Sequence, residues 1–238
     1  MCTVTFLPYR DKIFLTSNRD EQVQRPAAFA PVIEKMSTGK ILYPKDGKAG
    51  GTWIALHNNG NAMVLLNGAT EKHHYKPPYK KSRGLVFLDV FDTAFPSREF
   101  LKTDLQDIEP FSLMIWDNNQ LFEARWNGSD AFIEEIDHRV PHIWSSVTLY
   151  DKEVIEKREE WFNTWLAERS SMTIESILDF HRFGGEGNEQ IDLRMNRNGL
   201  LKTVSITGIE LTPEKSVMYY NDMLTGVESV NEWLFANS

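Results

Sequence analysis

The stretch "MCTVTFLPYRDKIFLTSNRDE" (residues 1–21) opens the chain and predicts a β-hairpin. Residues 2–7 and 12–17 are β-prone, and the "PYRD" between them is typical of a turn. In an antiparallel hairpin the end of the second strand lies beside the start of the first. The segment "SNRDE" (17–21) would therefore bring Arg19 and Asp20 close to Cys2, which is the single cysteine of the 238 residues.

The position of Cys2 leaves two interpretations open. A cysteine so near a chain end could be a small packed hydrophobe or a chance surface residue. Alternatively, removal of the initiator methionine would leave a thiol and a free α-amine on the same residue. A free α-amine has a pKa of about 7.7–8.0, so it could take the thiol proton during attack and return it to a leaving group.

Three further residues could complete such a site. An arginine beside a thiol favours the thiolate, and a carboxylate would hold the α-amine, which are the roles expected of Arg19 and Asp20. Asn67 ends the apolar run "AMVLLNG", and an amide N–H aimed at an oxyanion contributes about 10²–10³ in rate. The alternatives are a solvated charge cluster and a turn asparagine. Because successive strand residues face opposite ways, Arg19 and Asp20 would share a target only if the strand ends in a turn there.

The composition excludes several classes of protein. Apolar residues make up 41% and charged residues 25%, which is typical of a globular chain. The net charge of −8 disfavours nucleic-acid binding, which needs a basic surface. The N-terminal sequence does not have the pattern of a signal peptide, and the apolar runs are too short to span a membrane. The single cysteine excludes an internal disulfide. We expect a cytoplasmic protein.

The remaining sequence predicts strands and helices in separate blocks. Strands 52–57 and 61–67 flank "HNNGN", one or two helices fall within 82–106, and strands resume in "PFSLMIWDNNQLFEARWNGSDAFIEEI". Helices follow over 151–169 and 173–182, then a long mobile loop over 184–199, two strands, and a short terminal helix. This order predicts one α+β domain over residues 1–238 with antiparallel sheets rather than a doubly wound parallel sheet.

Several motifs together resemble the NRDE family of transport-and-Golgi-organisation-like proteins. The resemblance rests on "MC" at the start, "SNRDEQVQRPA" (17–27), "GGTWIA" (50–55) and "RGLV" (83–86), and it is strong over about the first ninety residues. That family is similar in turn to the cysteine N-terminal-nucleophile (Ntn) hydrolases, such as bile-salt hydrolases and penicillin V acylases. The resemblance implies a four-layer αββα sandwich of two antiparallel sheets.

The resemblance also implies a set of site residues. The amidases carry a cysteine behind methionine, an Arg-Asn-x-Asp segment and an oxyanion-hole asparagine, which match Cys2, Asn18, Asp20 and Asn67 here. The sequence departs from their pattern at three positions. Ser17 stands where they have the arginine, so that Arg19 follows Asn18 instead, Ser146 is the nearest candidate for a second active-site asparagine, and Lys202 replaces a late arginine.

Two functions follow from these observations. The leading hypothesis is an amidohydrolase that uses Cys2, with Arg19, Asp20 and Asn67 beside it, to cleave the C–N bond of a linear or cyclic non-peptide amide. The alternative is a non-catalytic carrier on the same fold that binds haem or a lipid-like ligand, because eukaryotic members of the family are linked to such ligands. No resident cofactor or metal is expected, since the histidine spacing fits no closed zinc site. The oligomeric state is left open.

Overall fold

The N-terminal hairpin is present in the computed structural model, which describes residues 3–235. Strand β1 (Thr3–Tyr9) pairs antiparallel with β2 (Lys12–Gln22), and the register places Thr3 opposite Asn18. The predicted end of the second strand at residue 17 is wrong. β2 continues to Gln22 because residues 18–22 also pair with β12 (Leu201–Leu211). The "SNRDE" segment therefore lies within a central strand rather than in a turn.

The hairpin forms part of the first of two antiparallel sheets. Its strand order is β10-β1-β2-β12-β13-β14, with β11 paired to the start of β12. The strands not yet introduced are β10 (His142–Ser145), β11 (Asn196–Arg197), β13 (Lys215–Asp222) and β14 (Glu228–Leu234). β2 and β12 make the longest pairing of this sheet, since both are 11 residues long.

The second sheet follows chain order from β3 to β9. Its strands are β3 (Phe29–Lys35), β4 (Lys40–Lys45), β5 (Ile54–His57), β6 (Ala62–Asn67), β7 (Phe111–Asp117), β8 (Gln120–Trp126) and β9 (Ala131–Ile136). The predictions for residues 52–57, 61–67 and 111–136 are confirmed. The sequence analysis did not identify β3 and β4. β3 is an edge strand with mostly accessible residues and an internal proline, so it lacks a clear alternation of apolar and polar residues.

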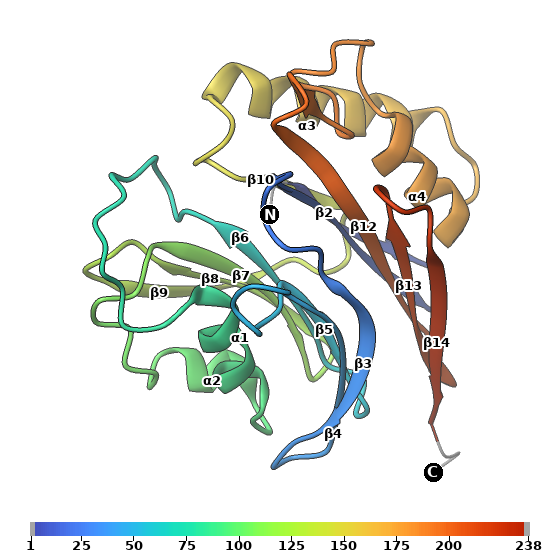
Figure 1. The fold of residues 1–238 in the computed structure, drawn as a ribbon. Coiled ribbons are helices and arrows are strands. Elements are labelled where there is room, and N and C mark those ends of the chain that lie inside the picture. The colour runs from blue at the N-terminus through green and yellow to red at the C-terminus, as the bar shows by residue number, and fades with distance from the viewer. Residues whose placement is uncertain (1–2, 236–238) are drawn as a thin grey trace.

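Two pairs of helices cover the outer faces of the sheets (Figure 1). α1 (Arg83–Phe91) and α2 (Pro96–Phe100) pack on β6, β7 and β8. α3 (Lys152–Ala167) and α4 (Ile174–Phe183) pack on β10, β2 and β12. The order is helices, sheet, sheet, helices. The α+β sandwich of antiparallel sheets is confirmed, as are the helices predicted over 82–106, 151–169 and 173–182.

Hydrophobic side chains fill the space between these layers. The larger core lies between the sheets and behind α1 and α2, and it includes Val4, Phe6 and Leu15 from the hairpin. A second core lies beneath α3 and α4 and includes Leu7 and Phe14. The hairpin strands therefore contribute alternate residues to two different cores, which fixes the direction of every side chain along them.

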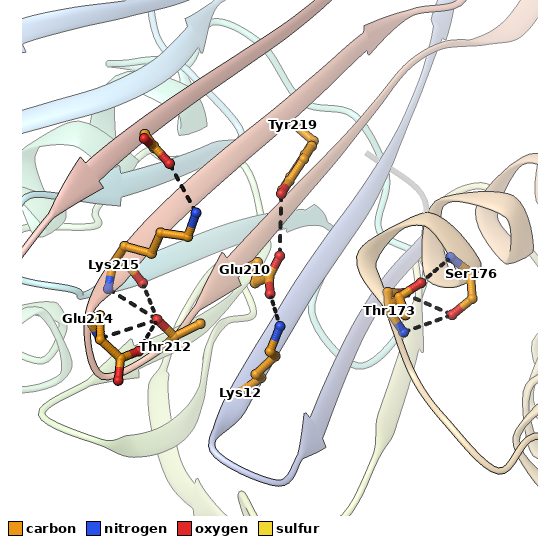
Figure 2. A network of polar contacts seen from close by, with 9 residues as sticks. Lys12, Thr173, Ser176, Glu210, Thr212, Glu214, Lys215 and Tyr219 are labelled. Atoms are coloured by element: carbon orange, nitrogen blue, oxygen red, sulfur yellow. Dashed lines mark hydrogen bonds and ion pairs between the residues drawn. The ribbon is translucent and has the colours of Figure 1, made fainter.

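Local sequence explains where the second pair of helices begins. Asp151 caps α3 by accepting the backbone N–H of Val154 at 3.1 Å. Thr173 and Ser176 form a reciprocal capping box at the start of α4 (Figure 2). These short polar side chains satisfy backbone donors that the first turn leaves unpaired.

Two expectations for the last third of the chain are wrong. The segment after β13 forms strand β14 rather than a terminal helix, because its alternating exposure follows the period of a strand edge paired with β13. The segment 184–199 is tied down by backbone hydrogen bonds from residues 191 and 192 to Asn188 and by the pairing of β11 with β12. It is an ordered connection rather than a long mobile loop.

Two features of residues 3–235 bear on membrane and metal association. No helix in this part of the chain is long and apolar enough to cross a membrane. The same residues contain no group of three or more His, Cys, Asp or Glu side chains arranged to hold a metal ion.

A buried histidine joins α4 to the hairpin. His181 is fully buried, and its Nδ1 lies 2.7 Å from Asn18 Oδ1, while Thr5 Oγ1 lies 2.8 Å from its Nε2. The Asn18 amide nitrogen donates to two carbonyls, so its oxygen accepts from His181 Nδ1–H. Burial, reinforced by the charge of Arg158, lowers the pKa of His181 to about 3. The folded protein therefore holds this imidazole neutral.

This histidine predicts a pH dependence of stability. Between about pH 6.5 and pH 3 the unfolded chain binds a proton at His181 that the folded protein excludes. The free energy of unfolding should therefore fall with decreasing pH, by up to about 1.4 kcal/mol per pH unit from this group. Urea titrations across this range should show a smaller pH slope for His181→Gln. His74→Gln, which replaces an exposed histidine, should keep the wild-type slope. If both variants reduce the pH slope of the free energy of unfolding equally, the assignment of this slope to His181 is contradicted.

Candidate active site

Strand β2 distributes the "SNRDE" segment over both faces of the first sheet. Leu15 belongs to the core between the sheets and Phe14 to the core beneath the helices. Arg19 consequently faces the second sheet, and Asp20 faces the helix layer. Because β2 does not turn at this point, the two side chains do not converge from one side as the predicted cluster required. They approach the start of β1 from its two faces.

Arg19 is held by a network on the inter-sheet face. Its Nη2 donates to Asp46 Oδ2 at 2.6 Å, and its guanidinium carbon lies 4.5 Å from the centre of the Trp53 ring. Arg25 donates from Nε and Nη2 to the two oxygens of the same carboxylate, both at 2.9 Å. Charge-assisted pairs of this geometry are short and directional. Asp46 thus fixes two guanidinium groups side by side.

Asp46 follows β4, and its own loop positions it. Its Oδ1 accepts the backbone N–H groups of Lys48 and Ala49 at 3.1 and 2.7 Å. Burial alone would raise the pKa of Asp46, but the hydrogen bonds from Arg25 and Ala49 and the charges of both arginines hold it below the usual value. The carboxylate stays ionised and keeps Arg19 in place.

Arg19 and Asn67 line one cavity of about 380 Å³ between the sheets and the segment that leads into α1. The wall is strongly polar. Its charged and aromatic members are Arg19, Glu21, Arg25, Asp46, Trp53, Tyr75, Tyr79, Lys81, Arg83 and Glu109. Two of the predicted site residues therefore share a ligand-sized space.

Asn67 is the last residue of β6 and lies between two cavities. It also lines a second cavity of about 230 Å³, together with Ser112 and Ser146. Ser146 Oγ donates to the Asn67 carbonyl oxygen at 2.8 Å, so it fixes the backbone at this point. The Asn67 side-chain amide makes no hydrogen bond to any residue between 3 and 235. It is available to a ligand in either cavity.

Asp20 is buried on the helix-facing side of β2. Tyr150 Oη donates to its Oδ2 at 2.7 Å, and Thr203 Oγ1 donates to its Oδ1 at 2.5 Å. Tyr150 stands just before α3, and Thr203 belongs to β12 beside a register shift between positions 203 and 205. Asp20 is not among the residues that line the cavity of Arg19 and Asn67.

Two more of the predicted residues lie apart from that cavity. Asn18 faces α4, and its amide nitrogen donates to the carbonyls of His181 and Leu193 at 3.1 and 2.7 Å. Lys202 lines a different cavity of about 570 Å³, near Arg182 and Arg194. The structure thus brings Arg19, Asn67 and Ser146 around adjoining cavities and places Asn18 and Lys202 elsewhere.

Cys2 lies outside the described residues. The next residue, Thr3, is buried at the start of β1, where its Oγ1 accepts a hydrogen bond from Arg158. Along β1 the side chains of Val4 and Phe6 belong to the core between the sheets, whereas Thr5 binds His181 on the helix side. These contacts fix the first residues of β1.

Several residues around the cavity were not assigned a role from sequence. Arg25, Trp53 and Arg83 lie within motifs that carried the family resemblance, but no pattern indicated what they contact. Asp46 had no local signal, since its partners are 21 and 27 residues away. Arg83 pairs with Glu109 at 3.2 Å, and burial lowers its pKa although the Glu109 charge opposes this shift.

The motifs "GGTWIA" and "RGLV" meet at a close backbone contact. Thr52 N–H donates to the Gly84 carbonyl at 3.2 Å. A Cβ atom built on Gly51 would lie 2.3 Å from the carbonyl carbon of Gly84. This clash is with a backbone atom, so rotation of a side chain could not relieve it. Both glycines are therefore required for the loop before β5 to approach the start of α1, which joins Trp53 to Arg83 across the cavity.

Comparison with solved structures identifies the fold as Ntn-hydrolase-like. Two variants of the conjugated bile acid hydrolase from Clostridium perfringens align with TM-scores of 0.60, at 11% and 12% identity, over 100% of this chain and 97% of theirs. The Caenorhabditis elegans N-acylethanolamine-hydrolyzing acid amidase ortholog aligns with a TM-score of 0.51 and 13% identity, over 87% of this chain and 92% of the other. At these identities the likeness concerns the fold.

The family is defined by sequence. The model of the family "Transport and Golgi organisation 2" matches residues 1–210. The chain belongs to this family, which confirms the resemblance drawn from its motifs. No curated protein matches the chain in a search of sequences.

The contact between the two glycines predicts a specific loss of stability. Gly51→Ala should destabilise the fold by about 1–3 kcal/mol, because the added methyl group must displace backbone atoms of α1. Urea unfolding measures this loss. Gly187→Asn is a suitable control, because its side chain would enter open space and asparagine tolerates the positive φ of 85°. Equal stability of the Gly51→Ala variant and the wild type would contradict the close approach.

Proposed function

We propose that this protein is an amidohydrolase whose nucleophile is Cys2 after removal of Met1. The substrate would be a small molecule with a linear or cyclic non-peptide amide. Cys2 supplies the thiol and its α-amine acts as the base, Arg19 stabilises the thiolate, Asp20 orients the amine, and Asn67 donates to the oxyanion. Ser146 supports Asn67 through its backbone carbonyl.

The observation that carries the proposal is the shared cavity of Arg19 and Asn67. A fixed guanidinium and an amide without a hydrogen-bond partner among residues 3–235 line the same ligand-sized space. Asn67 is half-buried at the cavity wall, so its amide can donate to a ligand oxygen there. The solved proteins with this fold include a conjugated bile acid hydrolase and an N-acylethanolamine-hydrolyzing acid amidase, and these names support hydrolysis of an amide here.

The positions of Arg19 and Asp20 on opposite faces of β2 suit an N-terminal residue. The α-amine and the side chain are separate substituents of one Cα atom, so they can address different partners. The pairing of β1 with β2 ends with Thr3 opposite Asn18, so Arg19 and Asp20 are the next two residues of β2 beyond that pair. We therefore assign the thiol to the side of Arg19 and the amine to the side of Asp20.

The proposed reaction proceeds in two balanced steps. The α-amine takes the thiol proton while the sulfur bonds to the amide carbonyl carbon, and Asn67 donates to the resulting oxyanion. The intermediate collapses with cleavage of the C–N bond, and the ammonium returns the proton to the leaving amine. Water, deprotonated by the amine, then attacks the thioester carbon and releases the acid together with the restored thiol.

The polar cavity wall favours catalysis over the alternative of a haem or lipid carrier. Apolar ligands bind in pockets lined mainly by hydrophobic and aromatic side chains. Here the wall of the cavity shared by Arg19 and Asn67 carries Arg19, Arg25 and Arg83, with Glu21 and Glu109 among them. Such a wall suits a polar substrate whose orientation must be fixed.

The nucleophile assignment is tested with Cys2→Ala. Intact mass of the native protein should show that Met1 is absent, and a panel of chromogenic N-acyl amides should identify a substrate for the wild type. Cys2→Ala should abolish hydrolysis of this substrate, because no other group in the proposal can form the thioester. Its melting temperature should match that of the wild type. Hydrolysis that persists in Cys2→Ala would exclude Cys2 as the nucleophile, and binding of a hydrophobic ligand without any hydrolysis by the wild type would favour the carrier.

The role of Asp20 is tested with Asp20→Asn. Loss of the carboxylate should leave the α-amine without its ionic partner and lower turnover by about 10²–10⁴, the range of a positioned acid–base group. The iodoacetamide alkylation profile of Cys2 against pH should shift in the same variant. Asp137→Asn, which removes an exposed carboxylate paired with Arg139, serves as the control. A lower melting temperature with an unchanged alkylation profile would make Asp20 a purely structural residue.

A further inference from the structure

A tyrosine behind Asp20 is enclosed by two arginines. Tyr150 is buried, and the guanidinium carbons of Arg158 and Arg197 lie 3.7 and 5.3 Å from the centre of its ring. Its hydroxyl donates to Asp20 Oδ2 and also lies 3.0 Å from Met195 Sδ. A phenol in this setting cannot turn its hydroxyl away from Asp20 without leaving both cations.

Arg158 is unusual because it is fully buried on the apolar face of α3. Its Nε and Nη2 donate to the carbonyls of Ile191 and Asp192 at 2.7–3.0 Å, and its Nη1 donates to Thr3 Oγ1. Within residues 3–235 no carboxylate forms an ion pair with it. Buried charges are normally paired. The guanidinium here is compensated by carbonyl oxygens and by the face of the Tyr150 ring.

Arg197 fixes the other side of the ring. It donates to the carbonyl of Leu149 at 3.0 Å and to that of Gln190 at 3.1 Å. The two arginines therefore tie the segment 190–192, the residue before Tyr150 and the first residue of β1 into one unit. Movement of the ring would break contacts with three separate parts of the chain.

We propose that Tyr150 is a positioning residue that aims the Asp20 carboxylate at the α-amine of Cys2. This inference rests on the proposed function. Tyr150 and Thr203 each donate to a different oxygen of Asp20, so the plane of the carboxylate is fixed. Tyr150 thus acts through Asp20: it sets the direction of the carboxylate and does not itself contact the substrate.

The charged groups around this unit come from three elements. Arg158 belongs to α3, Arg197 belongs to β11, and Arg19 with its partner Asp46 lies across β2 on the inter-sheet face. Removal of the Tyr150 hydroxyl alone leaves all of these charges in place. A change in the titration of the Cys2 amine would then report the aim of Asp20 rather than a change in net charge.

The experiment uses the single cysteine as a probe. Cysteine labelled with carbon-13 at Cα and Cβ gives one pair of NMR signals, because Cys2 is the only cysteine in the chain. The Cα shift follows the α-amine and the Cβ shift follows the thiol. In the wild type the amine pKa should lie above the usual 7.7–8.0, since a nearby carboxylate favours the ammonium.

Tyr150→Phe should lower this amine pKa by about half a unit or more, because the carboxylate is no longer held toward the ammonium. Asp20→Asn should lower it further. Tyr219→Phe is the matched control, since its hydroxyl contacts the carboxylate of Glu210, which Lys12 also binds, in a separate polar cluster (Figure 2). The control should leave both Cys2 signals with their wild-type titration.

The outcomes separate this inference from the proposed function. Met1 retained in the intact mass would overturn the proposed function and the positioning role together. A shift in Asp20→Asn without one in Tyr150→Phe would overturn the positioning role alone, and so would a lower melting temperature of Tyr150→Phe with an unchanged titration. If Tyr150→Phe does not fold, Arg197→Lys decides by the same measurement, because it keeps the positive charge but disturbs the contacts of Arg197 with the Leu149 and Gln190 carbonyls beside Tyr150. A lower amine pKa in this variant supports the positioning role of Tyr150, and an unchanged one overturns it.

Discussion

The site depends on the position of β2 between two partners. β2 pairs with β1 on one side and with β12 on the other through residue 22, so the "SNRDE" segment is held as a straight strand. A straight strand sends consecutive side chains to opposite faces. Arg19 therefore belongs to the space between the sheets and Asp20 to the helix layer. The same pairing anchors Thr3 opposite Asn18.

Features that depend on local periodicity could be predicted from the sequence. The whole pattern of apolar and polar residues lies within a few helical turns or one pair of strands in three cases. These are the hairpin at the N-terminus, the strands on either side of "HNNGN" and the helix over residues 151–169. The order of these elements was sufficient for the α+β class. The motifs then identified the family, which the match over residues 1–210 confirms.

Features that depend on distant partners could not be predicted. Strand β14 exists because β13 is available to pair with it, and the segment alone resembles a short helix. Asp46 became part of the site only when folding brought β2 and the loop after β4 together. Arg158 interrupts the apolar face of α3 that includes Phe162. The carbonyl groups that accept its hydrogen bonds are some 33 residues away, so the sequence around Arg158 does not indicate them. The opposite directions of Arg19 and Asp20 required the true end of β2.

The contact of Gly51 with Gly84 has a consequence for natural variation in this chain. Two walls of the cavity meet there as bare backbone, and Arg83 directly precedes one of the two glycines. Neither position can accept a side chain unless α1 moves. A larger residue at one position cannot be compensated by a smaller residue at the other, because glycine is already the smallest residue. Intolerance to substitution at these two positions would therefore result from the short distance between two backbone segments. It would not indicate a contact with a ligand, because neither residue has a side chain.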